Sequence, residues 1–147
     1  AAPAFDLATD GDGRVTLAGL KGKAVILYFY PKADTPGCTT EGLDFSALAD
    51  QFAAANAVVI GVSRDAVKKL DRFKAKHDLK VVLGSDEDGA VCEAYGTWVM
   101  KKLYGREYMG VERATFLIDG AGVVRRVWRN VKVKGHAEQV LEAAQSL

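Results

Sequence analysis

The run AVILYFY at Ala24–Tyr30 has an apolar or aromatic side chain at every position. An unbroken run of this length is typical of a β-strand covered on both faces of its sheet, as in the parallel part of an α/β fold. It is the longest apolar run of the chain, and a membrane-spanning helix needs about 20 such residues. The stretch therefore predicts a central strand and no membrane span.

Strand and helix patterns alternate after this run. Apolar residues at helical spacing, Phe45, Leu48 and Phe52, predict an amphipathic helix after the first strand. Later, the segment DGAG at 119–122 separates two strand-like runs as a hairpin turn does. The order predicts an α/β fold with a central mixed β-sheet flanked by helices. The expected strands are Ala24–Tyr30, Val58–Ser63, Val81–Leu83, Ala114–Ile118 and Val123–Trp128, and the other expected helices carry Val67, Leu70 and Phe73, then Val91–Tyr95, then Val140, Leu141 and Ala144.

Length and composition indicate one globular domain over residues 1–147. The chain has 147 residues, of which 49% are hydrophobic and 27% charged, without repeats or a Pro/Gly/Ser linker. Its 20 Lys and Arg and 19 Asp and Glu are interleaved and give a net charge of +1. This balance argues against a nucleic-acid surface or an acidic tail, so we expect small molecules or other proteins as partners.

The chain has only two cysteines, Cys38 and Cys92, which are too few and too far apart for a disulfide framework. Free thiols fit a reducing interior, so we expect a cytoplasmic location. The sequence opens on AAP with no initiator Met and no charged-then-apolar leader, a pattern expected of a trimmed or processed N terminus.

No metal or cofactor is expected. His77 and His136 lack the spacing of metal ligands, and His136, directly after Gly135, is a plausible start for the last helix. The acidic segments 10–13 and 86–89 lack the later acidic ligand of a calcium loop. The chain has neither a P-loop nor a dinucleotide-binding glycine motif.

The segment PKADTPGCTTE at Pro31–Glu41 follows the central strand and places Cys38 in the first turn of the next helix. At a helix N terminus, unpaired backbone N–H groups and the helix dipole favour a thiolate over a thiol. Two prolines and Gly37 fix the loop and leave room for a ligand near the backbone. We therefore expect an accessible, nucleophilic thiol.

Two neighbours of Cys38 bear on this interpretation. Thr35 is placed to offer its hydroxyl to the sulfur or to a bound substrate. Glu41 suits the helix dipole but would disfavour a thiolate if it pointed at the sulfur. The alternative for Cys38 is a small buried core residue, but its setting beside Gly37 and two threonines lies outside any apolar run.

The string YFYPKADTPGCTTE at Tyr28–Glu41 resembles the active-site segment of the peroxiredoxins, and more narrowly the PrxQ branch, also called bacterioferritin comigratory protein. Pro31, Thr35 and Cys38 match the family pattern of Pro, three residues, Thr or Ser, two residues, Cys. The resemblance continues through SDEDG at 85–89, CEAYG at 92–96 with Trp98, and RATFLID at 113–119. It covers nearly the whole chain and implies a thioredoxin-like fold.

The resemblance implies an antioxidant, thioredoxin-dependent thiol peroxidase that reduces hydrogen peroxide and organic hydroperoxides through a cysteine sulfenic acid. Cys38 would be the peroxidatic nucleophile, Pro31 would shield it, and Arg113 would polarise the O–O bond. Backbone N–H groups of Gly37 and Cys38 are expected to help. Taken alone, Arg113 would be read as a surface arginine flanking a strand. The resemblance also favours a monomer.

The chain departs from the family in how the sulfenic acid is reduced. Many PrxQ proteins have a resolving cysteine five residues after the peroxidatic one, where this chain has Leu43, and others have it on the next helix, where Asp65–Asp78 contains none. Cys92 is either a resolving cysteine or, as its short apolar helix favours, a buried packing residue. We expect a one-cysteine cycle with an external thiol such as thioredoxin or glutaredoxin with glutathione.

Two other functions remain open at this point. A thiol–disulfide oxidoreductase needs a Cys-x-x-Cys pair, and Glu41 stands at the second position. In a redox sensor without enzyme activity, oxidation of Cys38 would change an interface.

Overall fold

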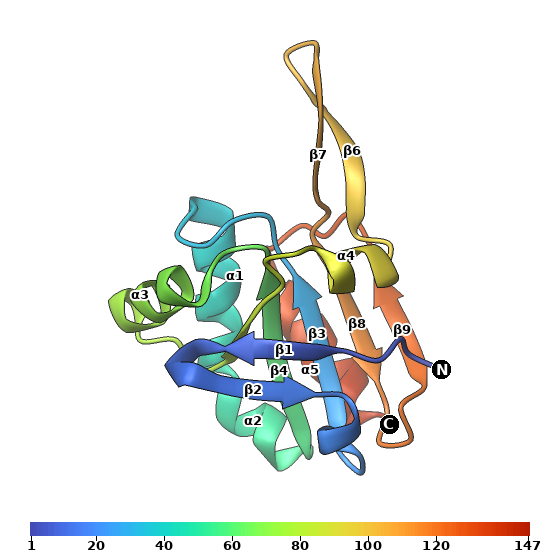
Figure 1. Cartoon of the computed structure of the whole chain (residues 1–147). Coiled ribbons are helices and arrows are strands. Elements are labelled where there is room, and N and C mark those ends of the chain that lie inside the picture. Colours follow the sequence, from blue (N-terminus) through green and yellow to red (C-terminus); the bar gives the residue numbers. More distant parts are fainter.

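The computed structural model describes the whole chain, residues 1–147. Its centre is a sheet of 7 strands in the order β2-β1-β5-β4-β3-β8-β9, with a separate β6–β7 hairpin (Figure 1). The strands are β1 (Asp6–Thr9), β2 (Gly13–Thr16), β3 (Ala24–Phe29), β4 (Ala57–Ser63), β5 (Val82–Ser85), β6 (Trp98–Leu103), β7 (Arg106–Val111), β8 (Ala114–Ile118) and β9 (Val124–Trp128). The helices are α1 (Pro36–Ala47), α2 (Ala49–Ala54), α3 (Val67–His77), α4 (Ala90–Ala94) and α5 (His136–Gln145), with short 3-10 turns at Asp10–Asp12 and Ala18–Leu20.

The predicted mixed sheet is confirmed. Strands β3, β4 and β5 run parallel, and β8 and β9 add to β3 as an antiparallel hairpin. All six residues of β3 are buried, which is the burial expected for a strand covered on both faces. The apolar run at 24–30 therefore forms the middle of the molecule.

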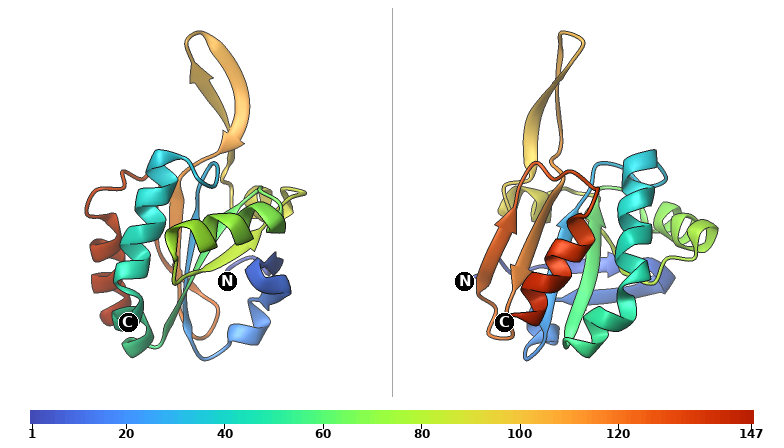
Figure 2. Two further views of the ribbon diagram at one scale, coloured as in Figure 1. Left: turned by 90° about the vertical axis from the view of Figure 1, so that its left-hand side faces the viewer. Right: turned by 180° about the vertical axis from the view of Figure 1, so that it is seen from behind.

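The two faces of the sheet carry separate apolar cores. Ile26 and Tyr28 point into a core shared with α1, α2, α3 and α5. Val25 and Leu27 point into a second core, shared with α4 and the N-terminal strands. Figure 2 shows α1, α2 and α5 together on the first face. Alternation along one strand thus assigns each neighbouring residue to one face or the other.

The helix pattern differs from expectation at one place. One helix was predicted through Phe45 and Phe52, but α1 ends at Ala47 and α2 begins at Ala49. Leu48 leaves helical geometry, with φ −101° and ψ 9°, and its N–H donates to the carbonyls of Phe45 and Ser46. The break redirects the chain while both phenylalanines remain in the same core.

The hairpin formed by β6 and β7 was not predicted from the sequence. It projects from the body (Figure 1), and its strands pair only with each other. Tyr104 and Gly105 form the two-residue turn, both with positive φ, 51° and 78°. None of the helices is long and apolar enough to cross a membrane.

Candidate active site

The predicted helix start around Cys38 is present. Helix α1 begins with Pro36 in its first turn after Thr35, whose backbone is extended. Thr39 donates its N–H to the Thr35 carbonyl at 2.8 Å. The N–H groups of Gly37 and Cys38 lie ahead of this bond and have no acceptor. Two backbone donors and the positive end of a 12-residue helix therefore lie at the cysteine.

Cys38 itself is buried, which corrects the expectation of an accessible thiol. Only 2% of the residue is exposed, and it belongs to the same core as Tyr28 and Tyr30. The turn-forming residues that suggested exposure do lie outside: Pro36 and Gly37 are exposed while the sulfur points inward. The sulfur is therefore almost completely shielded from solvent.

Arg113 contacts the Cys38 sulfur although the two residues are 75 positions apart in the sequence. It stands just before β8, the strand that pairs with β3, so the sheet brings it to the end of β3. Its Nη2 donates to Cys38 Sγ at 3.3 Å and its Nη1 to Glu41 Oε1 at 2.6 Å. Burial lowers the pKa of the guanidinium, but the charges of Glu41 and Cys38 outweigh this and raise it. One permanent cation thus bridges two acidic groups.

Glu41 points at Arg113 and not directly at the sulfur. The residue is only 1% exposed, and its second oxygen, Oε2, has no hydrogen-bond partner. Burial raises the pKa of the Glu41 carboxyl to about 7, although Arg113 acts in the opposite direction. The carboxyl therefore changes its protonation state near neutral pH.

This titration predicts a pH dependence of stability. The folded pKa of about 7 exceeds the usual 4.5, so the folded state holds a proton that the unfolded chain releases. The stabilisation of the folded state by this extra proton is complete below about pH 4.5 and is lost as the pH rises through 7. Relative to Glu41→Gln, the wild type should lose roughly 2 kcal/mol of unfolding free energy between pH 5 and 8. Urea denaturation at several pH values measures this, and parallel profiles for the two proteins would contradict it.

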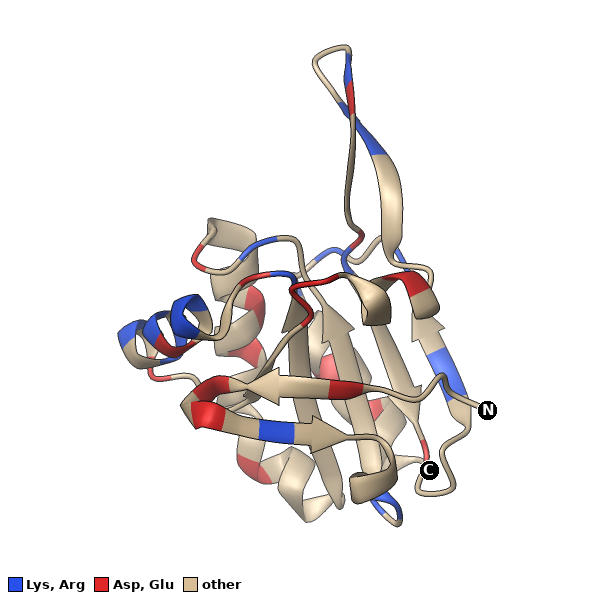
Figure 3. Ribbon diagram, viewed as in Figure 1, with Lys and Arg blue, Asp and Glu red and all other residues tan.

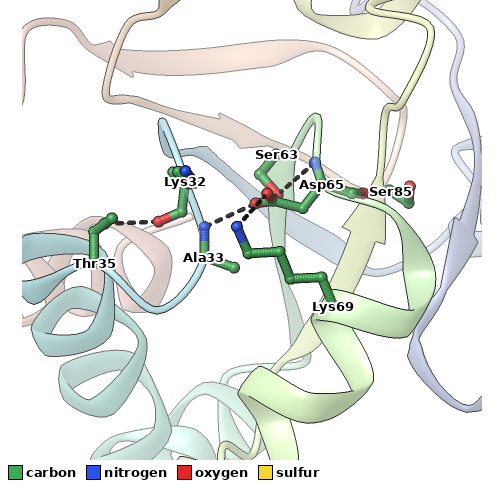
Figure 4. Close-up of polar contacts among 7 residues, drawn as sticks. All are labelled: Lys32, Ala33, Thr35, Ser63, Asp65, Lys69 and Ser85. Atoms are coloured by element: carbon green, nitrogen blue, oxygen red, sulfur yellow. Dashed lines mark hydrogen bonds and ion pairs between the residues drawn. The ribbon is translucent and has the colours of Figure 1, made fainter.

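The other predicted site residues lie on the loop between β3 and α1. The Thr35 hydroxyl donates to the Lys32 carbonyl at 2.7 Å (Figure 4), so it is not a donor to the sulfur and has only acceptor lone pairs to offer. Pro31 is exposed and precedes this turn. At Gly37, a Cβ would lie 3.2 Å from Nη2 of Arg113, so the glycine leaves room for the guanidinium.

Asp65 anchors this loop, and sequence reasoning missed it. Its Oδ2 accepts the N–H of Ala33 at 2.7 Å and the hydroxyl of Ser63 at 2.8 Å (Figure 4). The Ser85 hydroxyl donates to its carbonyl at 2.6 Å, and Lys69 pairs with it at 3.3 Å. The loop is thereby tied to the ends of β4 and β5. Its place directly after a buried parallel strand was the available signal.

Cys92 lies on the opposite face of the sheet. It belongs to the core with Val25 and Leu27, whereas Cys38 belongs to the other core. Asp86 accepts the N–H groups of Val91 at 3.1 Å and Cys92 at 2.7 Å and so caps α4. Burial, together with Asp86, raises the pKa of the Cys92 thiol to about 12. The structure does not bring the two cysteines together, and both are free thiols.

Known proteins resemble this chain over nearly its whole length. The AhpC/TSA family model matches residues 1–127. A protein of Coxiella burnetii named putative peroxiredoxin bcp is 51% identical over 140 residues, covering 95% of this chain and 93% of its own. Peroxiredoxin Bcp of Bacillus subtilis is 46% identical, and the match covers 99% of this chain and 93% of that protein.

Solved structures agree. One from Xanthomonas campestris, described for the alkyl peroxide reduction activity of its bacterioferritin comigratory protein, has a TM-score of 0.92 at 46% identity and covers 97% of this chain and 90% of its own. The structure of peroxidoxin BcpB from Mycobacterium tuberculosis has a TM-score of 0.86 at 33% identity. The match covers 99% of this chain and 94% of that chain. The same thioredoxin-like architecture is therefore present in this chain.

Proposed function

The chain belongs to the AhpC/TSA family, in its Bcp/PrxQ branch, and is a thiol-dependent peroxidase; we propose that Cys38 is its peroxidatic cysteine. The observation that carries this assignment is the 3.3 Å contact between Arg113 Nη2 and Cys38 Sγ at the N terminus of α1. A nucleophilic thiolate needs such an electropositive setting. Cys92, buried beside the Asp86 carboxylate, has the opposite setting.

The site accounts for the peroxide-reducing step. The Cys38 thiolate attacks the terminal oxygen of the hydroperoxide, an S–O bond forms and the O–O bond breaks. Sulfur loses two electrons, and the second oxygen leaves as hydroxide or alkoxide and takes a proton from solvent to become water or alcohol. Arg113 and the free N–H groups of Gly37 and Cys38 stabilise the growing negative charge. The Thr35 oxygen accepts the O–H of the substrate, and Pro31 limits access from solvent.

The cycle is of the one-cysteine type. The internal positions that could supply a second thiol are occupied by Leu43 or lie in α3, which has no cysteine. Cys92 faces the other core. An external thiol therefore attacks the sulfenic acid, releasing water and forming a mixed disulfide, and a second thiol frees Cys38. Thioredoxin, or glutaredoxin with glutathione, has the chemistry for both steps.

The wider role follows from this reaction. Two free cysteines fit a reducing, cytoplasmic setting, where the enzyme would serve antioxidant defence and redox homeostasis as a monomer. The alkyl peroxide activity described for the Xanthomonas relative supports organic hydroperoxides as substrates beside hydrogen peroxide.

Stopped-flow oxidation of the reduced protein tests this function. Hydrogen peroxide and an organic hydroperoxide should each oxidise Cys38 orders of magnitude faster than they oxidise free cysteine, with sustained turnover when an external thiol is supplied. A rate equal to that of free cysteine would leave only a redox-sensing role.

A further inference from the structure

Glu112 and Arg113 form the two-residue link between the projecting hairpin and the central sheet. Strand β7 ends at Val111 and β8 begins at Ala114. The strands of the hairpin pair only with each other, so any movement of the hairpin reaches Arg113 through this link. The guanidinium contacts the Cys38 sulfur at 3.3 Å, and a group at an active site has to be held within about 0.5 Å of its working position. The link therefore needs anchors of its own.

The backbone of the link is hydrogen-bonded on both sides. The Glu112 N–H donates at 2.7 Å to the carbonyl of Thr97, the residue before β6. The Arg113 carbonyl accepts the N–H of Val131, which follows β9, at 2.9 Å. The link is thus held between the segment before β6 and the segment after β9.

The Glu112 side chain adds a second hold on the segment after β9. Its Oε1 accepts from Arg129 Nη2 at 2.9 Å, and its Oε2 accepts the N–H of Asn130 at 2.8 Å. The same Nη2 also donates to the Gly96 carbonyl at 2.6 Å. Figure 3 shows an acidic segment at the base of β7 with basic segments next to it. One carboxylate therefore joins the link to two other segments of the chain.

Two consecutive N–H groups after β9 point at the link. Asn130 donates to the Glu112 carboxylate, and Val131 donates to the Arg113 carbonyl. Asn130 has a left-handed backbone, with φ 47°, a conformation that asparagine adopts more readily than most residues. This short segment consequently holds the side chain of one residue of the link and the backbone of the next.

Glu112 is an anion at neutral pH although it is partly buried. Its side chain is only 18% exposed. Burial raises the pKa of the carboxyl, but the hydrogen bonds from Arg129 and Asn130 outweigh burial and hold the pKa below its usual value. A negative charge one residue from Arg113 would by itself disfavour the Cys38 thiolate. A favourable contribution of Glu112 must therefore come from the geometry that it maintains.

We propose that Glu112 is a positioning residue that keeps the Arg113 guanidinium in contact with the Cys38 sulfur. Arg129 and the N–H of Asn130 hold its carboxylate in place, and the carboxylate fixes the backbone from which the guanidinium extends. Glu112 does not touch the sulfur. The inference rests on the proposed role of Cys38 and adds a residue to it.

A pH titration of the thiolate, followed by its ultraviolet absorbance, tests this without any peroxide. Cys92 does not contribute near neutral pH because burial raises its pKa to about 12. In Glu112→Ala the absorbance of the Cys38 thiolate should appear about one pH unit higher than in the wild type, because a displaced guanidinium supports the thiolate less. If the lost carboxylate acted through its charge alone, the absorbance would move to lower pH.

Oxidation of Cys38 by hydrogen peroxide shows whether Glu112 acts through Arg113. Glu112→Ala should slow the reaction about tenfold in the wild-type background and cause no further slowing in Arg113→Ala. The matched control is Glu107→Ala, which removes the same charge from an exposed ion pair with Lys102. This control should leave both the titration and the rate unchanged.

Circular dichroism checks the fold of each variant. If Glu112→Ala does not fold, Arg129→Gln removes the other half of the ion pair from a side chain that is 45% exposed, and it should shift the titration in the same direction. An unchanged titration, a shift to lower pH, or equal slowing with and without Arg113 would overturn the proposal. If Cys38 were not peroxidatic, the wild-type rate would equal that of free cysteine, while the titration would still report on Arg113.

Discussion

Replacement of Arg113 by Ala should slow the oxidation of Cys38 by hydrogen peroxide by roughly 10²- to 10³-fold. The guanidinium donates to the sulfur at 3.3 Å and is the cation placed to stabilise the leaving oxygen. Its loss removes support from both the thiolate and the transition state. It also leaves Glu41 buried without its ion-pair partner, which favours the neutral carboxyl. Stopped-flow fluorescence of the reduced protein measures the rate constant.

Two further variants separate this effect from a general loss of charge. Arg113→Lys keeps a cation but cannot reach Cys38 and Glu41 at once, so an intermediate rate is expected. Arg125→Ala removes an exposed arginine that pairs with Asp119 and should leave the rate unchanged. A wild-type rate in Arg113→Ala would remove this residue from the mechanism.

Replacement of Cys38 by Ser should reduce peroxidase turnover to the background rate, whereas Cys92→Ser should keep most of it. A serine hydroxyl in place of the Cys38 sulfur is not ionised near neutral pH and cannot attack a peroxide at a comparable rate. Cys92 is fully buried on the other face of the sheet and is not needed for an external reductant. Turnover with a thioredoxin system and with a small thiol compares the two variants.

The serine at position 92 carries a stability cost that must be kept apart from activity. The Asp86 carboxylate can accept the serine hydroxyl, but oxygen fills less of this buried site than sulfur, so a loss of about 1 kcal/mol of unfolding free energy is expected. Cys92→Ala removes the thiol without adding a polar group and serves as the matched control. If folded Cys92→Ala lost turnover as completely as Cys38→Ser, the one-cysteine cycle would be wrong.

The sequence was most informative where burial and local geometry agree. The apolar run at 24–30 predicted the central strand because a strand covered on both faces cannot alternate. The turn residues before Cys38 predicted the start of α1 because helix starts depend on few neighbouring residues. The hairpin of β8 and β9 was likewise predicted from its glycine turn.

The sequence was less informative where distant segments meet. Burial of Cys38 depends on Arg113 and on the core beneath it, and nothing in the segment 31–41 encodes either. Asp65, two residues after the end of β4, holds the loop through the N–H of Ala33, far away along the chain. Strands β6 and β7 have exposed Met100, Leu103 and Tyr108, so no core-facing alternation marks them. Arg113 was assigned only through the family resemblance.

Mass spectrometry of the intact, non-reduced protein after one equivalent of peroxide distinguishes a Cys38 sulfenic acid from an internal disulfide. We expect the intact chain to gain one oxygen atom and Cys92 to stay a free thiol. In a parallel sample, dimedone should condense with the Cys38 sulfenic acid, with loss of water, and leave its adduct on the Cys38 peptide. A loss of two hydrogens with a Cys38–Cys92 peptide pair would contradict it, because the two sulfurs would then have met despite lying in separate cores.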